Sequence, residues 1–412
     1  MTTRVVVTGI GLVTSVGNDT ATTWQALREG KSGIRRIERF DPADQEVTFA
    51  GEVRNLDVSR YMDRKELRRN DRIVSYAVVA AMEALEQSGL DVRANSDDVG
   101  VIVGSGVGGL ESHHEQFKIL YSKGPDRISP FYITQTIVDI LSGYISILTG
   151  AGGPNFSTVS ACATSANAIG ESYETIRRGD AKAMIAGGAE CAVTPIGIAA
   201  FNNMHALSRR NDDPQGASRP FDATRDGFVM GEGAGILVLE DLEFAQARGA
   251  TILGEIVGYG ATADAYHITE PIPQGTGLQR AMRRAIEKSG MRLTDVGYIN
   301  AHGTSTPFND KTETAAIKGL FGEHAYAMQI SSTKSMIGHT LGGAGGIEAG
   351  VTLLSLREGI LTPTINLEHP DPECDLDYVP NVARKTNATL ALSNSMGFGG
   401  HNASLAIRKW AD

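Results

Sequence analysis

The sequence predicts an α/β protein made of two halves with similar topology, residues 1–250 and 251–412. Three observations lead to this prediction: the length, an internal repeat, and short apolar runs beside glycine clusters. A single hydrophobic core stops growing at roughly 250–300 residues, and this chain has 412. Its 41% hydrophobic and 21% charged residues are typical of a folded globular protein.

The repeat gives the two halves the same local plan. AMEALEQSGL at residues 81–90 is followed by a polar loop and the apolar run VIVGSG, and AMRRAIEKSGM at residues 281–291 by a shorter loop and YINAHG. Both copies predict a helix that ends at Ser-Gly, then a buried strand that ends at a glycine turn. A weaker pair is RVVVTGIG near the start and GEIVGYG at residues 254–260. Chance similarity is the alternative.

A second segment, residues 157–190, predicts strand, helix and strand. STVSA favours a strand, apolar residues then recur at helical spacing until Gly179, and AMIAGGAE at residues 183–190 favours the next strand. Most residues from Ala161 to Gly170 are small, so we expect this helix to be buried between sheets. Residues 330–359 repeat the pattern of strand, glycine turn and small-residue helix.

Charge and cysteine content exclude several classes of protein. The net charge of -10 disfavours binding to nucleic acid. No run approaches the ~20 apolar residues of a membrane span, and Thr and Gly interrupt the apolar segment at Arg4–Val16, so we expect no membrane insertion. Cys162, Cys191 and Cys374 lie far apart without a CxxC pair, which supports neither disulfides nor a zinc ribbon. We therefore expect a reduced, cytoplasmic enzyme.

Cys162 is the candidate nucleophile. It lies where the STVSA strand is expected to turn into the small-residue helix. Amides and the dipole at a helix N-terminus lower the pKa of a thiol. The alternative is a buried structural cysteine, which is how we interpret Cys191 and Cys374.

Polar residues in the second half could act with Cys162. His302 in NAHGTSTP and His339 in TKSMIGHTLGG follow expected strands, and Lys334 precedes His339 by five residues. Either histidine alone could be structural. Metal binding by Cys162 and the two histidines is a further alternative, which their scattered spacing disfavours. The turn GFGG at residues 397–400 could aim amides at a ligand oxygen or simply connect two strands.

These segments together resemble the β-ketoacyl-acyl-carrier-protein synthases of the elongating type II class. The resemblance spans essentially the whole chain and rests on a series of motifs in the family's order: RVVVTGIGLVTSVGN, ISPFYITQTI, SACATSANAIG, AGGAE, ASRPFDATRDGFVMGEGAG, DAYHIT, NAHGTSTPFNDKTE, SSTKSMIGHTLGGAGGIEA, PTINL and NSMGFGGHN. It implies the thiolase-like fold, two pseudo-symmetric α/β halves in a five-layered α-β-α-β-α arrangement. The first half would carry the nucleophilic cysteine and the second the two histidines.

The resemblance also implies roles for individual residues. Cys162 is the expected nucleophile, His302 and His339 complete a Cys-His-His triad, Lys334 accompanies them, and Glu348 is a structural acid. The amides of Cys162 and Phe398 would form the oxyanion hole, with the Phe398 ring as gate. Thr304 and Thr306 would touch the phosphopantetheine arm. Ser165, Ala166 and Asn167 stand at variable positions, and His401 stands where many relatives have Thr. No cofactor and no metal is expected.

The implied reaction is a decarboxylative condensation that lengthens an acyl thioester by two carbons. The implied partners are acyl carrier protein, loaded with acyl or malonyl groups, and a second copy of the chain, with residues 157–161 and Ile133 near the interface. Val107, Ile133 and Phe201 would set the depth of the acyl pocket. Docking of the acidic carrier is expected on a basic helix face made of Arg64, Lys65, Arg68, Arg69 and Arg72, with a solvated surface as the alternative. Arg209 and Arg210 are a weaker candidate.

Related activities fit less well. A degradative thiolase needs a second cysteine at the last glycine turn, which here holds none, and a priming synthase would have Asn where His339 stands. A non-catalytic chain-length partner would lack Cys162. The catalytic ketosynthase subunit of a type II polyketide synthase keeps all these residues and remains the alternative.

Overall fold

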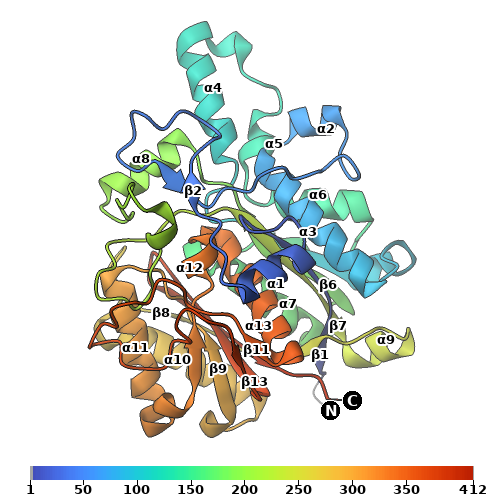
Figure 1. The fold of residues 1–412 in the computed structure, drawn as a ribbon. Coiled ribbons are helices and arrows are strands. Elements are labelled where there is room, and N and C mark those ends of the chain that lie inside the picture. The colour runs from blue at the N-terminus through green and yellow to red at the C-terminus, as the bar shows by residue number, and fades with distance from the viewer. Residues whose placement is uncertain (1–2, 412) are drawn as a thin grey trace.

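A ten-stranded mixed sheet runs through the molecule (Figure 1). The computed structural model describes residues 3–411. Along the sheet the order is β5, β4, β6, β7, β1, β8, β14, β13, β9, β10. The strands are β1 (Val5–Val13), β4 (Val99–Gly104), β5 (Asn155–Phe156), β6 (Ala183–Glu190), β7 (Gly233–Asp241), β8 (Gly254–Ala263), β9 (Val296–Asn300), β10 (Gln329–Ser331), β13 (Leu390–Gly397) and β14 (His401–Arg408).

The two halves of this sheet have the same topology. Numbered within its own half, each set of five strands has the spatial order 3-2-4-5-1, with two parallel pairings followed by two antiparallel ones. The halves join where Val5–Val7 of β1 pair antiparallel with Gly254–Ile256 of β8. The predicted fold class, two pseudo-symmetric α/β halves, is confirmed.

Helices cover both faces of the sheet and fill the space between its halves. α3 (Arg72–Ser88) packs on β1 and β7, and α10 (Thr276–Ser289) packs on β8 and β14. Between the two half-sheets lie α7 (Thr164–Arg178) and α13 (Ala344–Glu358), which contact each other and strands of both halves (Figure 1). This gives the expected five layers, with the small-residue helices in the middle one.

Glycines allow the outer helices to approach the sheet closely. A Cβ on Gly9 or Gly11 of β1 would overlap carbonyl oxygens of α3, and one on Gly258 or Gly260 of β8 would overlap carbonyl oxygens of α10. The weak sequence echo between RVVVTGIG and GEIVGYG therefore has a packing cause, since both strands serve the same helix–sheet contact.

Smaller elements surround this core. The remaining helices are α1 (Thr20–Arg28), α2 (Arg64–Arg69), α4 (Leu110–Lys123), α5 (Tyr132–Thr136), α6 (Ile140–Thr149), α8 (Pro195–Asn203), α9 (Leu242–Ala247), α11 (Pro307–Phe321) and α12 (Lys334–Ile337). Two short hairpins are β2 (Arg35–Arg36) with β3 (Phe49–Ala50), and β11 (Ile360–Leu361) with β12 (Arg384–Lys385). 3₁₀ turns are η1 (Arg93–Asp98), η2 (Pro125–Arg127), η3 (Ala161–Ala163), η4 (Pro214–Gly216), η5 (Pro273–Gly275), η6 (Leu293–Asp295), η7 (Gly322–Ala327) and η8 (Leu341–Gly343). Within residues 3–411, no helix is long and apolar enough to cross a membrane.

The expected STVSA strand is wrong in its position. The paired strand β5 stops at Phe156, before this segment begins. Local hydrogen bonds explain the difference, because Ser160 N donates to Thr164 Oγ1 at 2.9 Å and Thr158 Oγ1 donates to Thr164 O at 3.0 Å. Hydroxyls of Ser and Thr offer the backbone partners that compete with a strand ladder.

The basic segment at residues 64–72 is also not one helix, contrary to the expectation. α2 ends at Arg69, Asn70 is extended, and Asp71 starts α3 by accepting a hydrogen bond from Ile73 N at 3.1 Å. Arg72 therefore belongs to a different helix from the other four basic residues. An Asp that caps a helix N-terminus is a common way to separate two helices.

Candidate active site

Cys162 lies in a tight turn at the start of the central helix α7. The 3₁₀ turn Ala161–Ala163 precedes α7 directly, and Ala161 has a φ of 50°. The second half repeats this geometry, since Leu341, with a φ of 45°, opens the 3₁₀ turn before α13. Positive φ is uncommon for residues other than glycine. The two turns bring the starts of both central helices to one place.

Two histidines face the Cys162 sulfur. His302 follows β9, His339 follows α12, and both are 3% exposed. The Cys162 Sγ and one ring nitrogen of each histidine lie within 4.8 Å of one another. The imidazole rings meet nearly at right angles, 87°, with centroids 5.2 Å apart. The structure thus brings the three predicted residues into one buried cluster.

Hydrogen bonds assign the protons on the two imidazoles. Nδ1 of His339 accepts from Leu341 N at 3.3 Å. Nδ1 of His302 lies 3.4 Å from Nζ of Lys334, which can only donate. A neutral imidazole whose Nδ1 accepts must carry its proton on Nε2. Both histidines are therefore arranged as Nε2–H donors.

Burial keeps both imidazoles neutral. Desolvation lowers the pKa of His302 and of His339 well below the usual 6.5, and the Lys334 ammonium lowers both further. Lys334 is itself buried and is ion-paired with Glu348, one of whose oxygens accepts from its Nζ. Burial raises the pKa of the Glu348 carboxyl to about 7, and Lys334 opposes that rise. Neutral donors beside a fixed cation suit stabilisation of a developing negative charge.

The Cys162 thiol differs from the expectation that a helix terminus lowers its pKa. Burial raises the pKa of this thiol to about 12, outweighing Lys334 and the amides of Phe398 and Cys162, which lower it. Those same two amides face the sulfur, and Gly397 allows the close approach because a Cβ there would lie only 2.6 Å from Ser160 O and 3.2 Å from Cys162 N. The geometry therefore places two amide donors at the thiol without making the resting thiol a thiolate.

A cavity of about 330 Å³ opens onto Cys162. It is lined by the two histidines and by Thr304, Thr306, Phe201 and Phe398, together with Asp226, Gly227, Phe228 and Met396. Val107 and Ile133 do not line it; they are 40% and 63% exposed on the surface of the protomer. Of the three predicted acyl-pocket residues, only Phe201 lies at the cavity.

Glu313 was not predicted as a site residue, yet it shapes the turn that carries His302. Its carboxylate accepts from the amides of His302 and Gly303 at 2.9 and 2.8 Å. Burial raises the pKa of this carboxyl to about 7. The lining residues Asp226–Phe228 were also missed as site residues, although they lie in the motif ASRPFDATRDGF. The sequence signal for these lining residues was the motif itself, to which the resemblance assigned no side-chain role.

Cys162, His302 and His339 have the donor types of a three-ligand zinc site. Two features of the structure favour thiol chemistry instead. The Lys334 ammonium lies against His302, and backbone amides are directed at the sulfur that a metal would need. The cluster is suited to a bound anion more than to a cation.

The predicted docking residues differ in their surroundings. Arg64, Lys65, Arg68 and Arg69 are exposed on α2, and none of them lies within 4 Å of a carboxylate in the described part of the chain. The Arg69 guanidinium stacks 5.0 Å above the Phe131 ring. Arg72 is instead ion-paired with Glu111 at 2.7 Å. Of the weaker pair, Arg209 is ion-paired with Glu46 and Arg210 with Asp226.

The fold and the site are those of an acyltransferase of the thiolase-like class. The beta-ketoacyl synthase N-terminal domain matches residues 2–245, and the beta-ketoacyl synthase C-terminal domain matches residues 253–368. The chain belongs to the beta-ketoacyl synthase family.

Individual relatives agree with this membership. The chain is 54% identical to a 3-oxoacyl-[acyl-carrier-protein] synthase 2 of Synechocystis sp. over 99% of this chain and 98% of the relative. A crystal structure of a beta-ketoacyl synthase from Burkholderia phymatum is 37% identical, covers 100% of both chains and has a TM-score of 0.93. A type II polyketide synthase acyl-carrier protein has been solved in complex with its ketosynthase bound to a hexaketide, and a chain of that complex is 32% identical to this one, covers 100% of both chains and has a TM-score of 0.92.

Proposed function

We propose that this chain condenses an acyl group held on Cys162 with a malonyl group held on acyl carrier protein, releasing carbon dioxide and extending the acyl chain by two carbons. The observation that carries the proposal is the arrangement around the sulfur: the amides of Cys162 and Phe398 face it, and one ring nitrogen of each neutral histidine lies within 4.8 Å. Each set of donors can hold one of the two negative oxygens that the reaction forms.

In the first step the Cys162 sulfur attacks the carbonyl carbon of the acyl thioester. The carbonyl oxygen becomes an oxyanion, which the amides of Cys162 and Phe398 bind. The bond to the pantetheine sulfur then breaks, and the thiol proton of Cys162 leaves with that sulfur. Each lost donor of such an oxyanion hole usually costs ~3–4 kcal/mol.

In the second step the malonyl thioester occupies the same cavity. Its carboxylate leaves as carbon dioxide, and the electron pair of the broken bond forms an enolate on the thioester. The Nε2–H groups of His302 and His339 donate to the enolate oxygen, so no strong base is required. The enolate carbon attacks the acyl carbonyl, and the Cys162 sulfur leaves and regains a proton from solvent.

The first test is the site of acylation. Incubation with acyl-carrier protein followed by digestion should place the acyl mass on Cys162, and Cys162→Ala should abolish it. Cys191 and Cys374 are internal controls because both are buried free thiols. An acyl mass on either of them would overturn the assignment.

The second test separates the two half-reactions. His302→Ala and His339→Ala should abolish condensation while some acyl-Cys162 still forms, because the two imidazoles act on the malonyl oxygen. Full condensation in both variants would refute the role.

The metal interpretation makes the opposite prediction. Extensive dialysis against EDTA should leave condensation unchanged, because N–H groups of the protein, and not a metal ion, stabilise the negative oxygens in the proposed reaction. Loss of activity that added zinc restores would favour the metal site.

Several features support acyl carrier protein as the partner. The relative described above was solved with its own acyl-carrier protein, and the exposed basic residues of α2 suit an acidic surface despite a net charge of -10. We also propose a homodimer, supported by apolar side chains at the outer edge strand β5, where Phe156 and Val159 are exposed.

Extension of fatty acids is favoured over the polyketide alternative. The identity is 54% to a 3-oxoacyl-[acyl-carrier-protein] synthase 2 and 32% to the polyketide ketosynthase. Incubation with malonyl-carrier protein and a series of acyl-carrier proteins, with products identified by mass, will test this choice. Products extended by one two-carbon unit support it, and repeated extension without reduction supports the polyketide role.

A further inference from the structure

Arg225 is a buried cation behind the wall of the cavity. Its side chain is 2% exposed, and it lies in the loop between η4 and β7. The next three residues, Asp226, Gly227 and Phe228, line the cavity. The reaction described above gives Arg225 no role.

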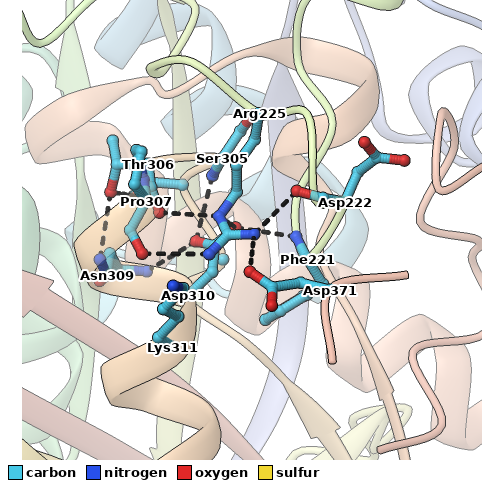
Figure 2. Close-up of polar contacts among 12 residues, drawn as sticks. Phe221, Asp222, Arg225, Ser305, Thr306, Pro307, Asn309, Asp310, Lys311 and Asp371 are labelled. Carbon is cyan, nitrogen blue, oxygen red and sulfur yellow. Dashed lines mark hydrogen bonds and ion pairs between the residues drawn. The ribbon is translucent and has the colours of Figure 1, made fainter. Parts of the chain in front are cut away.

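One side of the guanidinium holds the loop that carries the two threonines. Nε donates to Thr306 O at 3.1 Å, and Nη2 donates to Pro307 O at 3.0 Å (Figure 2). Thr306 is the N-cap of α11, and its hydroxyl lies 3.0 Å from that of Thr304. Arg225 therefore contacts the backbone of the segment that carries Thr304 and Thr306, both of which line the cavity.

The remaining contacts of the guanidinium are with Asp222, Asp310 and Asp371. Nη1 donates to Asp371 Oδ2 at 2.8 Å and to Asp222 O at 2.7 Å. Nε lies 3.5 Å from Asp310 Oδ2, and the fully buried Asp310 carboxylate accepts from Phe221 N at 2.8 Å and from Ser305 N at 3.2 Å. Three chain segments remote in sequence meet at this one side chain.

The chemistry of the group suits positioning. A guanidinium is a planar fork with five N–H donors, whereas an ammonium is a compact point charge. Arg225 donates four hydrogen bonds, one from Nε, two from Nη1 and one from Nη2, and only a guanidinium has N–H groups arranged to make all four. A lysine could neutralise Asp310 and Asp371 but could not hold Thr306 and Pro307 at the same time.

We propose that Arg225 is a positioning residue that fixes Thr304 and Thr306 for binding of the pantetheine part of the thioester substrate. The inference rests on the proposed function, because it assumes a thioester in this cavity. Arg225 touches no reacting atom, and it acts by keeping the two threonine hydroxyls in register with the cavity wall at Asp226–Phe228.

The test compares two thioesters of the same acyl group. Acyl-pantetheine includes the long amide arm, and acyl-N-acetylcysteamine retains only its end. With Arg225→Lys, the KM for acylation of Cys162 by acyl-pantetheine should rise about tenfold, the effect of losing roughly one well-placed hydrogen bond. Its kcat, the KM for the short thioester, and alkylation of Cys162 by iodoacetamide should stay within about twofold of wild type, since a factor of two is under 0.5 kcal/mol.

A double-mutant cycle identifies the route of the effect. In a Thr304→Ala/Thr306→Val background, Arg225→Lys should have no further effect on the KM for acyl-pantetheine, since the groups it positions are gone. Should Arg225→Lys fail to fold, Asp371→Asn removes only one anchor and should shift the same KM in the same direction by a smaller factor.

The matched control is Arg248→Lys. Arg248 is also largely buried, contacts the Glu240 carboxylate and donates to Ser88 O at 2.8 Å, at the end of β7 remote from the cavity. Arg248→Lys should lower the melting temperature without changing the KM for one thioester relative to the other.

An equal rise in KM for both thioesters in Arg225→Lys, or a rise that persists in the Thr304→Ala/Thr306→Val background, would overturn the inference. Absence of condensation by the wild type would instead reject the proposed function. The ratio of the KM values of the two thioesters for acylation of Cys162 would still be measurable.

Discussion

Opposing effects act on the Cys162 sulfur. Burial raises its pKa to about 12, while the Lys334 ammonium and the amides of Phe398 and Cys162 lower it. The resting group is therefore a thiol at neutral pH, and thiolate character develops only when an acyl carbonyl reaches the two amides. A nucleophile protected in this way reacts slowly with small electrophiles that do not form an oxyanion.

The first prediction concerns the pH dependence of alkylation at Cys162. Because the thiol pKa is raised, the rate of reaction with iodoacetamide should climb continuously from pH 7 to pH 9.5 with no plateau. Lys334→Met removes the cation that lowers the thiol pKa, so the thiolate fraction and the alkylation rate should fall at every pH. The rates are measured by peptide mass spectrometry, with Cys191 as a buried reference thiol.

A plateau below pH 8 in the wild type would contradict this prediction. It would mean that the start of α7 dominates over burial, as the sequence alone suggested. Unchanged alkylation in Lys334→Met would separately show that the ammonium does not act on the sulfur.

At the scale of elements, α2 carries exposed basic side chains that have no ion-pair partner in the described part of the chain. The second prediction is that Lys65→Glu/Arg68→Glu raises the KM for carrier-bound acyl groups and hardly changes the KM for acyl-pantetheine. Added salt should mimic this selective loss in the wild type, because exposed charges are screened over ~8–10 Å at physiological ionic strength. Steady-state kinetics with both substrates measure it.

Two controls limit the interpretation of the α2 variant. Arg72→Gln should have a smaller effect, since Arg72 is already ion-paired with Glu111. Arg283→Glu, an exposed reversal on α10, should have none. Equal effects on carrier-bound and carrier-free substrates would remove α2 from the docking site.

The third prediction concerns the central helix layer. A Cβ on Gly346 of α13 would overlap the carbonyl oxygen of Gly235 on β7. Overpacking of a dense core typically costs 1–3 kcal/mol, so Gly346→Ala should lower the free energy of unfolding by about 1–3 kcal/mol. Gly143→Ala is the matched control in α6, where a Cβ would meet nothing within 4 Å. It should raise stability by roughly 0.5–1 kcal/mol. Urea unfolding checks both, and equal changes would contradict the close packing.

At the scale of the whole molecule, one edge of the sheet is open. Within residues 3–411, β5 pairs only with β4, and Val159, three residues after this strand, is 57% exposed. Ile133 on α5 is a further exposed apolar residue, at 63%. An exposed strand edge beside apolar side chains commonly forms an interface. The protomer alone leaves this face uncovered.

The fourth prediction is a homodimer formed through this face. Light scattering at micromolar concentration should give twice the chain mass of 43.7 kDa. Ile133→Arg/Val159→Arg should shift the mass toward the monomer, whereas Val382→Arg, a substitution at an exposed apolar residue elsewhere, should not. A wild-type mass of one chain would refute the dimer.

The predictability of this protein differs between its parts. The repeated helix and strand were found because each copy carries its own stop signal, and Gly89 and Gly290 indeed end α3 and α10 in the left-handed conformation. The STVSA strand and the continuous basic helix were wrong because side-chain hydrogen bonds of Thr164 and Asp71, which periodicity does not show, redirect the backbone.

The same division applies to the site. Motifs located Cys162, His302, His339 and Lys334, since glycine turns and strand ends are local signals. Nothing local shows that Arg225 reaches Thr306, or that Val107 and Ile133 lie outside the cavity. The position of the proposed boundary at residue 250 stays a prediction.

The sequence by itself determined the fold class and the family and pointed to the candidate reactive groups, because these depend on short-range patterns and residue types. Only the tertiary structure decided the protonation of those groups, since the low pKa of both histidines and the raised pKa of Cys162 come mainly from burial in the folded chain. Desolvation and charge–charge interactions act through space. They therefore depend on which residues the fold brings together and not on the order of those residues in the chain.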